Sequence, residues 1–128
     1  MILYVDTSAL AKLLPPEHES AAIRDALRRQ PLTSSVLLRV ELMRAIRRRR
    51  PVFAPAALRL LSRVVEIDLD RSILEAAATL QPASVRTLDA IHLAIAATLG
   101  SDLDALVTYD ARMVAAAREA GLPVASPE

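Results

Sequence analysis

The sequence predicts an α/β fold, a three-layer sandwich in which helices cover both faces of a central sheet of four or five mainly parallel strands. Two short apolar runs, residues 2–5 and 105–109, are continuous rather than alternating, which is typical of strands buried on both faces. Helical patterns separate the expected strands, and this alternation favours a mainly parallel sheet. We expect one domain, 1–128, because a chain of 128 residues is long enough to bury a single core.

Each expected strand is a short apolar or partly alternating segment between helical stretches. The first apolar run stops at Asp6 and the run near the C-terminus stops at Asp110. The last strand is expected at an edge of the sheet, after Pro123. The expected strands are residues 2–5, 32–34, 64–69, 105–109 and a segment that begins at Val124.

The expected helices follow from apolar periodicity and from residues that favour helix ends. Ser35, Thr87 and Asp110 are predicted to be N-caps. Gly100 and Gly121 lie where a helix C-terminus favours a left-handed residue. The expected helices, caps included, are residues 7–14, 18–29, 35–48, 55–63, 71–80, 87–100 and 110–121.

The composition excludes several classes of site. Two glycines and no cysteine exclude glycine-rich phosphate loops, cysteine-based metal sites and disulfides, and two histidines exclude a three-histidine zinc site. Three aromatic residues are too few for a base-stacking platform, and a net charge of +1 indicates no particular partner. No apolar run approaches the ~20 residues of a membrane span, and no signal-peptide pattern is present, which indicates a reducing, cytoplasmic setting.

Four acids stand out because their neighbours are apolar: Asp6, Glu41, Asp89 and Asp110. Asp6 and Asp110 both follow a buried strand, at the sheet edge where open α/β folds bind ligands. Another interpretation remains open for three of them. Asp6 and Asp110 are also favoured N-caps, and Asp89 lies in a first helical turn, where the helix dipole favours an anion.

Glu41 has no such explanation, because it is expected in the middle of a helix. Its helical neighbours Leu37, Leu38 and Ala45 place it on the stripe that faces the core. An ionised carboxylate is almost never buried without a partner, and Arg44 is an alternative partner to a metal site.

Four carboxylates that point into one region repel each other. At an effective dielectric constant near 20, two charges ~4 Å apart interact with about 4 kcal/mol. A fold retains such a cluster only with a cation inside it, and oxygen ligands without His or Cys favour Mg²⁺ or Mn²⁺.

Four segments together resemble a known family: ILYVDTSAL at the start, VELMRA at 40–45, TLDAIHLAIA at 87–96 and LVTYDARM at 106–113. They resemble the PIN-domain ribonucleases, and in particular the VapC-type toxins of bacterial toxin–antitoxin pairs. The resemblance covers essentially the whole chain. It implies a metal-dependent endoribonuclease with a PIN-like sheet, a homodimer, and a small VapB-like antitoxin whose C-terminal tail blocks the site.

The resemblance also implies roles for individual residues. Asp6, Glu41, Asp89 and Asp110 match the four acidic positions of the family, and the three aspartates are expected to hold the metal ion. Glu41 is expected either to bind the ion through water or to orient the nucleophile. Two further residues match polar positions beside the metal site and are expected to hydrogen-bond the carboxylates: Ser8 and Thr108.

His92 lies three residues after Asp89 on the same helical face, and we interpret it as a hydrogen-bonded structural histidine. All but one of the 16 basic residues are arginine, whose planar fork suits phosphate. The candidate RNA contacts are Arg44, Arg47, Arg48 and Arg86. For the 47–50 run a solvated helix C-terminus is an equal alternative.

Two other functions are alternatives to a nuclease. A non-catalytic, acid-lined module would bind a metal or a partner and cleave nothing. A phosphoryl-transfer domain is disfavoured, because Asp6 is followed by Thr7 and Ser8 rather than by a second acid, and Lys12 lies a helical turn away.

Overall fold

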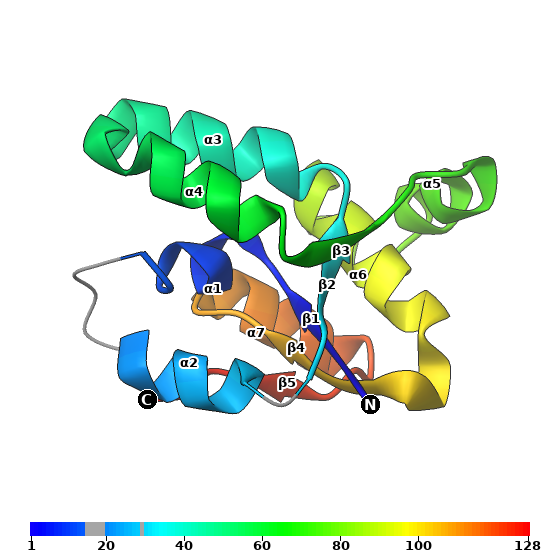
Figure 1. Cartoon of the computed structure of the whole chain (residues 1–128). Coiled ribbons are helices and arrows are strands. Elements are labelled where there is room, and N and C mark those ends of the chain that lie inside the picture. The colour runs from blue at the N-terminus through cyan, green and yellow to red at the C-terminus, as the bar shows by residue number, and fades with distance from the viewer. Residues whose placement is uncertain (15–19, 29) are drawn as a thin grey trace.

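Five parallel strands form the central sheet of the computed structural model, which describes residues 1–14, 20–28 and 30–128. Their order across the sheet is β3–β2–β1–β4–β5 (Figure 1). The strands are β1 (Ile2–Val5), β2 (Leu32–Ser35), β3 (Val64–Ile67), β4 (Leu103–Val107) and β5 (Val124–Ala125).

Seven α-helices and two short 3₁₀ helices connect these strands within the described ranges. The α-helices are α1 (Thr7–Ala11), α2 (Ser20–Leu27), α3 (Leu38–Arg49), α4 (Ala54–Leu61), α5 (Arg71–Ala78), α6 (Thr87–Thr98) and α7 (Ala111–Glu119). The 3₁₀ helices are η1 (Pro51–Phe53) and η2 (Gly100–Asp102). None of the described helices combines the length and the apolarity needed to cross a membrane.

Two apolar cores, one on each face of the sheet, give the molecule its three layers. Along β1, Leu3 and Val5 point to one face and Tyr4 points to the other, as the period of two in a strand requires. The first core joins the sheet to α1, α2, α3 and α4, and the second joins it to α5, α6 and α7 (Figure 1). The predicted α/β/α sandwich is therefore confirmed.

The strand order changes direction at β1, and this creates the edge that matters for function. The chain passes from β1 to β2 on one side, and later returns to place β4 on the other side of β1. In sheets of this type, ligands bind at the carboxyl ends of the strands where the order switches. Asp6 follows β1 at this edge, and its N–H donates to the carbonyl of Val107 at the end of β4 (3.2 Å).

The structure corrects two predicted caps. Ser35 is the last residue of β2, where its Oγ accepts the N–H of Leu37 (3.0 Å), and α3 begins at Leu38 without a side-chain cap. Thr87 is the first residue inside α6, and the extended residue before the helix is Arg86. Both predictions depend on the residue type, because Ser and Thr favour the cap position. In the structure the helical backbone begins after a different residue in each case, Leu37 and Arg86.

The predicted segments were otherwise right in type, but several of their ends are displaced: β2 and α3 extend one residue further than expected, and β4 begins two residues earlier. The strand expected at 105–109 ends at Val107, because the next residues turn toward α7. Helix α1 ends at Ala11 rather than at residue 14, and 18, 19 and 29 of the predicted second helix lie outside the described residues. Gly100 (φ 53°) and Gly121 (φ 77°) adopt the left-handed conformation expected after helices.

Candidate active site

Asp6 is a buried carboxylate at the carboxyl end of β1, with 5% of its surface exposed. Its Oδ1 accepts hydrogen bonds from the Ala9 N–H (2.9 Å) and the Ser8 Oγ (2.7 Å). Its Oδ2 accepts one from the Thr108 Oγ1 (2.5 Å). Burial raises the pKa of Asp6, and the hydrogen bonds from Thr108, Ser8 and Ala9 oppose that rise. Asp6 is therefore both the N-cap of α1 and a polar centre at the sheet edge.

The same two hydroxyls connect Asp6 to the segment that carries Asp110. Ser8 Oγ lies 3.3 Å from Thr108 Oγ1 and accepts the N–H of Tyr109 (2.9 Å). Thr108 Oγ1 accepts the N–H of Asp110 (3.1 Å). Asp110 itself is exposed and caps α7, because its Oδ1 accepts the Arg112 N–H (2.9 Å).

Glu41 is held by a buried hydrogen-bonded chain that crosses the second core. The Tyr4 hydroxyl lies 2.6 Å from His92 Nδ1, and His92 Nε2 lies 2.8 Å from Glu41 Oε1. Burial raises the pKa of Tyr4, so the phenol stays protonated; with the phenol donating to Nδ1, Nε2 carries the proton that is donated to Glu41. His92 is 1% exposed and has the structural environment expected for it.

Glu41 differs from the prediction in two respects. It lies in the first turn of α3 rather than in mid-helix, because the helix begins at Leu38. Its partner is His92, and within the described part of the chain it makes no hydrogen bond or ion pair with Arg44.

Asp89 shows that the four acids influence each other. It lies half-buried in the first turn of α6. Burial raises the pKa of Asp89, and the negative charges of Asp110, Asp6 and Glu41 raise it further, whereas His92 lowers it. Side chains from four different elements thus share one region of negative potential.

This donor set matches a hard divalent cation in kind. All four groups are carboxylates, and after burial, the charges of the other three raise the pKa of Asp89, a repulsion that a cation would relieve. Among the described residues, no group of three or more His, Asp or Glu side chains is already arranged to hold a metal ion. Shared metal binding by Asp6, Asp89 and Asp110 therefore stays a prediction, and it requires these side chains to move closer.

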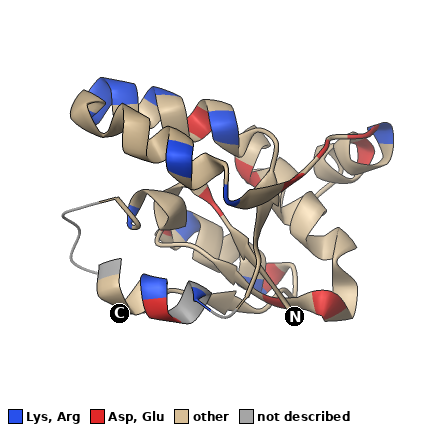
Figure 2. Cartoon of the chain, viewed as in Figure 1, with Lys and Arg blue, Asp and Glu red and all other residues tan. Residues whose placement is uncertain are grey.

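The candidate RNA contacts fall in two places. Arg44, Arg47 and Arg48 line an open groove along α3, and Figure 2 shows basic residues gathered along this helix. Arg48 lies seven residues after Glu41, which is about 10 Å along the helix axis. Arg86 precedes α6 and lines a pocket together with Asp89.

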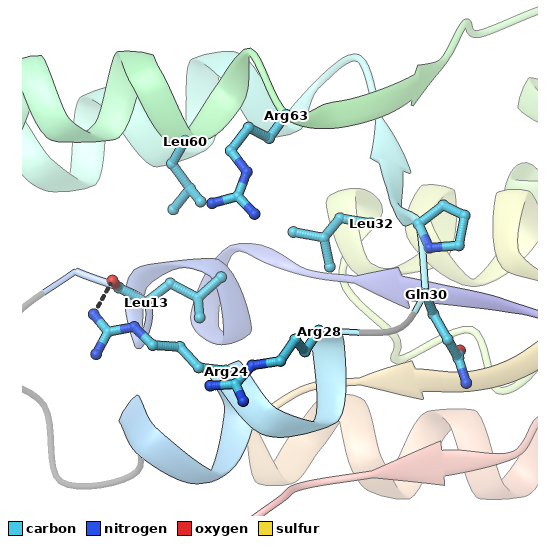
Figure 3. Close-up of a pocket in the computed structure, with 8 residues that line it drawn as sticks. Leu13, Arg24, Arg28, Gln30, Leu32, Leu60 and Arg63 are labelled. Carbon is cyan, nitrogen blue, oxygen red and sulfur yellow. Dashed lines mark hydrogen bonds between the residues drawn. The ribbon is translucent and has the colours of Figure 1, made fainter.

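A separate basic hollow of about 390 Å³ lies at the amino end of β2 (Figure 3). Arg24, Arg28 and Arg63 line it, and Arg24 already donates to the carbonyl of Leu13 (2.8 Å). Because the hollow is at the start of β2, it lies at the opposite edge of the sheet from Asp6, and none of the four acids lines it.

Sequence reasoning missed Tyr4 and Arg112. Tyr4 was interpreted as one residue of an apolar strand, and nothing local to it indicates a partner 88 residues away. Arg112 was detectable in principle, because it follows Asp110 by two residues and lies in the first turn of α7. Its side chain lines the same pocket as Arg86 and Asp89.

A doubly covered parallel sheet with acids at its switch point is the arrangement in which open α/β domains bind ligands. The chain belongs to the PIN-domain family, whose family model matches residues 3–119, and to the VapC ribonucleases within it. It is 44% identical to Ribonuclease VapC46 and 42% identical to Ribonuclease VapC47, both of Mycobacterium tuberculosis, over 98% of this chain and 97% of each relative.

Solved structures show the same fold. A toxin–antitoxin complex from Klebsiella pneumoniae matches with a TM-score of 0.74 and 24% identity, over 100% of this chain and 98% of that chain. VapBC2 from Rickettsia felis, bound to a DNA fragment from its promoter, matches with a TM-score of 0.72 and 16% identity over 100% of both chains.

Proposed function

We propose that this protein is a metal-dependent endoribonuclease that acts as the toxin of a toxin–antitoxin pair. The observation that carries the proposal is the gathering of four carboxylates from four elements, where burial and then the charges of Asp110, Asp6 and Glu41 raise the pKa of Asp89. Like charges gathered at this edge of the sheet repel each other and cost stability, and a role in binding a divalent cation explains their presence. The names of the relatives, which are ribonucleases, support the reaction type.

Each acid has a stated role. Asp6, Asp89 and Asp110 would hold Mg²⁺ or Mn²⁺, which when bound lowers the pKa of water and stabilises charge developing on the phosphate. Ser8 and Thr108 keep the Asp6 carboxylate fixed through its two oxygens.

Glu41 is the acid best suited to orienting the attacking water. His92 donates to its Oε1, which holds the carboxylate in place and leaves Oε2 for a second hydrogen bond. Contact of Glu41 with the ion through water remains the alternative role.

Arginines on two sides of the acids would bind the phosphates that flank the cleaved bond. Arg86 is closest in sequence to Asp89, and the open groove of Arg44, Arg47 and Arg48 extends away from Glu41 along α3. We propose that single-stranded RNA lies across the acids between these two groups.

The partner of the toxin is proposed to be a small VapB-like antitoxin, and the toxin itself is proposed to be a homodimer. Two structural neighbours are a toxin–antitoxin complex and a VapBC assembly, which supports an antitoxin as partner.

The test is cleavage of total RNA by the chain after removal of any co-purified protein. We expect cut fragments with Mg²⁺ or Mn²⁺, none with chelator, and loss of cleavage in Asp6→Asn. Asp102→Asn, an exposed acid of η2, is the matched control and should cleave normally. Sequencing the cut ends identifies the RNA. Binding of the ions without any cleavage would support the non-catalytic, acid-lined module instead.

A further inference from the structure

A pocket of about 420 Å³ lies beside Asp89, between the loop that precedes α6 and one face of α7. Its volume is within the range of small-ligand sites. Arg86 and Asp89 line it from the start of α6, and Arg112 and Glu119 line it from α7. We call it the Arg112 pocket.

Two arginines that line this pocket together with Asp89 are also close to the acids in the sequence. Arg112 begins α7 immediately after Asp110, whose Oδ1 accepts the Arg112 backbone N–H (2.9 Å). Arg86 lies three residues before Asp89. Neither guanidinium makes a hydrogen bond or ion pair with a described residue, so both are available to an anion.

The charges in the pocket set a direction. Glu119 lies seven residues after Arg112 on α7, about 10 Å along the helix axis. Arg86 and Arg112 outnumber Asp89 among the charged residues near the start of the two helices, so a phosphate is attracted to this end and repelled from the Glu119 end. Between them, Val85, Ala115 and Ala116 provide an apolar wall, which suits a ribose and a base rather than a second phosphate.

We propose that the Arg112 pocket binds one nucleotide of the RNA, adjacent to the phosphate that is cleaved. Arg86 and Arg112 contact its phosphate, because their planar forks donate two hydrogen bonds to one phosphate group. The inference rests on the proposed function and adds Arg112 and the α7 wall to the substrate-binding residues. The hollow of Figure 3 does not offer the same role, since it lies at the other edge of the sheet.

The first test measures binding without catalysis. Metal-free protein is titrated with AMP, GMP, CMP and UMP in turn, and with inorganic phosphate, by calorimetry. We expect at least one nucleotide to bind more tightly than phosphate, and Arg112→Ala to weaken it about tenfold, the loss of one charge-assisted contact. Arg112→Lys should retain part of the affinity, because it keeps the charge and loses the fork.

Arg118→Ala is the matched control. Arg118 is on the same helix but lines a different pocket, so its removal should leave nucleotide affinity unchanged. Equal affinities in Arg112→Ala and Arg118→Ala, with both proteins folded by thermal melt, would overturn the proposal. So would phosphate binding alone, or binding of a glutamate-rich peptide without any nucleotide, which would assign the pocket to a protein partner.

Cleavage kinetics separate this proposal from the proposed function. We expect Arg112→Ala to raise KM about tenfold with kcat nearly unchanged, since the contact is made equally in the ground and transition states. If the chain binds nucleotide through Arg112 but cleaves no RNA, the proposed pocket stands and the proposed nuclease function fails. Cleavage with a KM unaffected by Arg112→Ala would retain the nuclease and reject the pocket.

Discussion

At the level of single residues, Asp6 is both a helix cap and a candidate site residue. Its Oδ1 completes the N-terminus of α1, and its Oδ2 faces Thr108 on the neighbouring strand end. The two interpretations of Asp6, as a helix cap and as a candidate site residue, are therefore compatible. The three hydrogen bonds also limit the rise in its pKa that burial causes.

Asp89→Asn is expected to abolish cleavage and to leave the metal-free protein as stable as the wild type or more stable. Burial and three neighbouring carboxylates disfavour its charge, whereas the helix dipole favours it by about 0.3–1 kcal/mol. The raised pKa indicates that the unfavourable effects are larger. Thermal melts in chelator and in Mg²⁺ measure both, and Mg²⁺ should stabilise the wild type much more than the variant.

Asp70→Ala provides the contrast for this prediction. Asp70 caps α5 by accepting the Ile73 N–H (2.8 Å) and is not among the charges that act on Asp89, so its loss should cost about 1 kcal/mol. A clear drop in the metal-free melting temperature of Asp89→Asn, or equal Mg²⁺ shifts in wild type and variant, would contradict a shared metal site.

Tyr4→Phe is expected to destabilise the fold by about 1–3 kcal/mol, because it leaves the buried Nδ1 of His92 without its partner. Urea denaturation measures the change. Tyr109→Phe is the matched substitution, since that hydroxyl donates to the Pro127 carbonyl at a partly buried site, and it should cost less. Equal losses of stability in the two variants would show that the Tyr4–His92 hydrogen bond stabilises the fold no more than the Tyr109 hydroxyl does.

At the level of elements, the sequence predicted the order and type of each strand and helix, and the errors are at their ends. Continuous apolar runs identify buried strands because burial on both faces selects against polar residues. Ser35 and Thr87 were assigned as caps by residue type, but a cap depends on where the backbone becomes helical.

Gly121→Ala is expected to cost about 1 kcal/mol, although there is open space around the site. Nothing lies within 4 Å of a Cβ added at Gly121, so the cost comes from its φ of 77° alone. Gly121→Asn should lose less, since Asn tolerates this conformation better. Chemical denaturation measures the free energy of unfolding of both variants. A stabilised Gly121→Ala protein would contradict the conclusion that the positive φ of Gly121 determines the cost.

The groove along α3 is expected to bind phosphates, which the salt dependence of RNA binding can test. Each lost phosphate contact should make the slope of log affinity against log salt shallower by about 0.7 for a single strand. We expect this for Arg44→Ala and Arg48→Ala, and no change for Arg71→Ala on α5. Unchanged slopes in all three would favour a solvated helix face.

At the level of the whole molecule, the candidate acids were predictable and their supports were not. The acids were detectable because each lies in an apolar context, three of them at an expected strand or helix end and Glu41 on the apolar stripe of an expected helix. The hydrogen bonds that hold Glu41 join residues far apart in the sequence: His92 is 51 positions from Glu41 and 88 positions from Tyr4. Such contacts form only when the helices pack against the sheet. The sequence therefore located the acids without showing how they are fixed.

Expression of this chain alone is expected to arrest bacterial growth, and co-expression with a small partner to relieve the arrest. The proposed reaction destroys cellular RNA, whereas Asp6→Asn should be harmless because it removes a proposed ligand. Growth curves with matched expression levels measure this. Normal growth with the active chain and no captured small protein would contradict the toxin assignment.

The position of β1 at the centre of the sheet has a consequence for synthesis on the ribosome. Asp6 is made first, but Thr108 and Asp110, which complete its surroundings, are made more than a hundred residues later. Strand β4 must leave the exit tunnel before it can pair with β1. A partly synthesised chain therefore lacks the hydrogen-bonded surroundings of Asp6 until the segment that carries β4 and Thr108 has emerged.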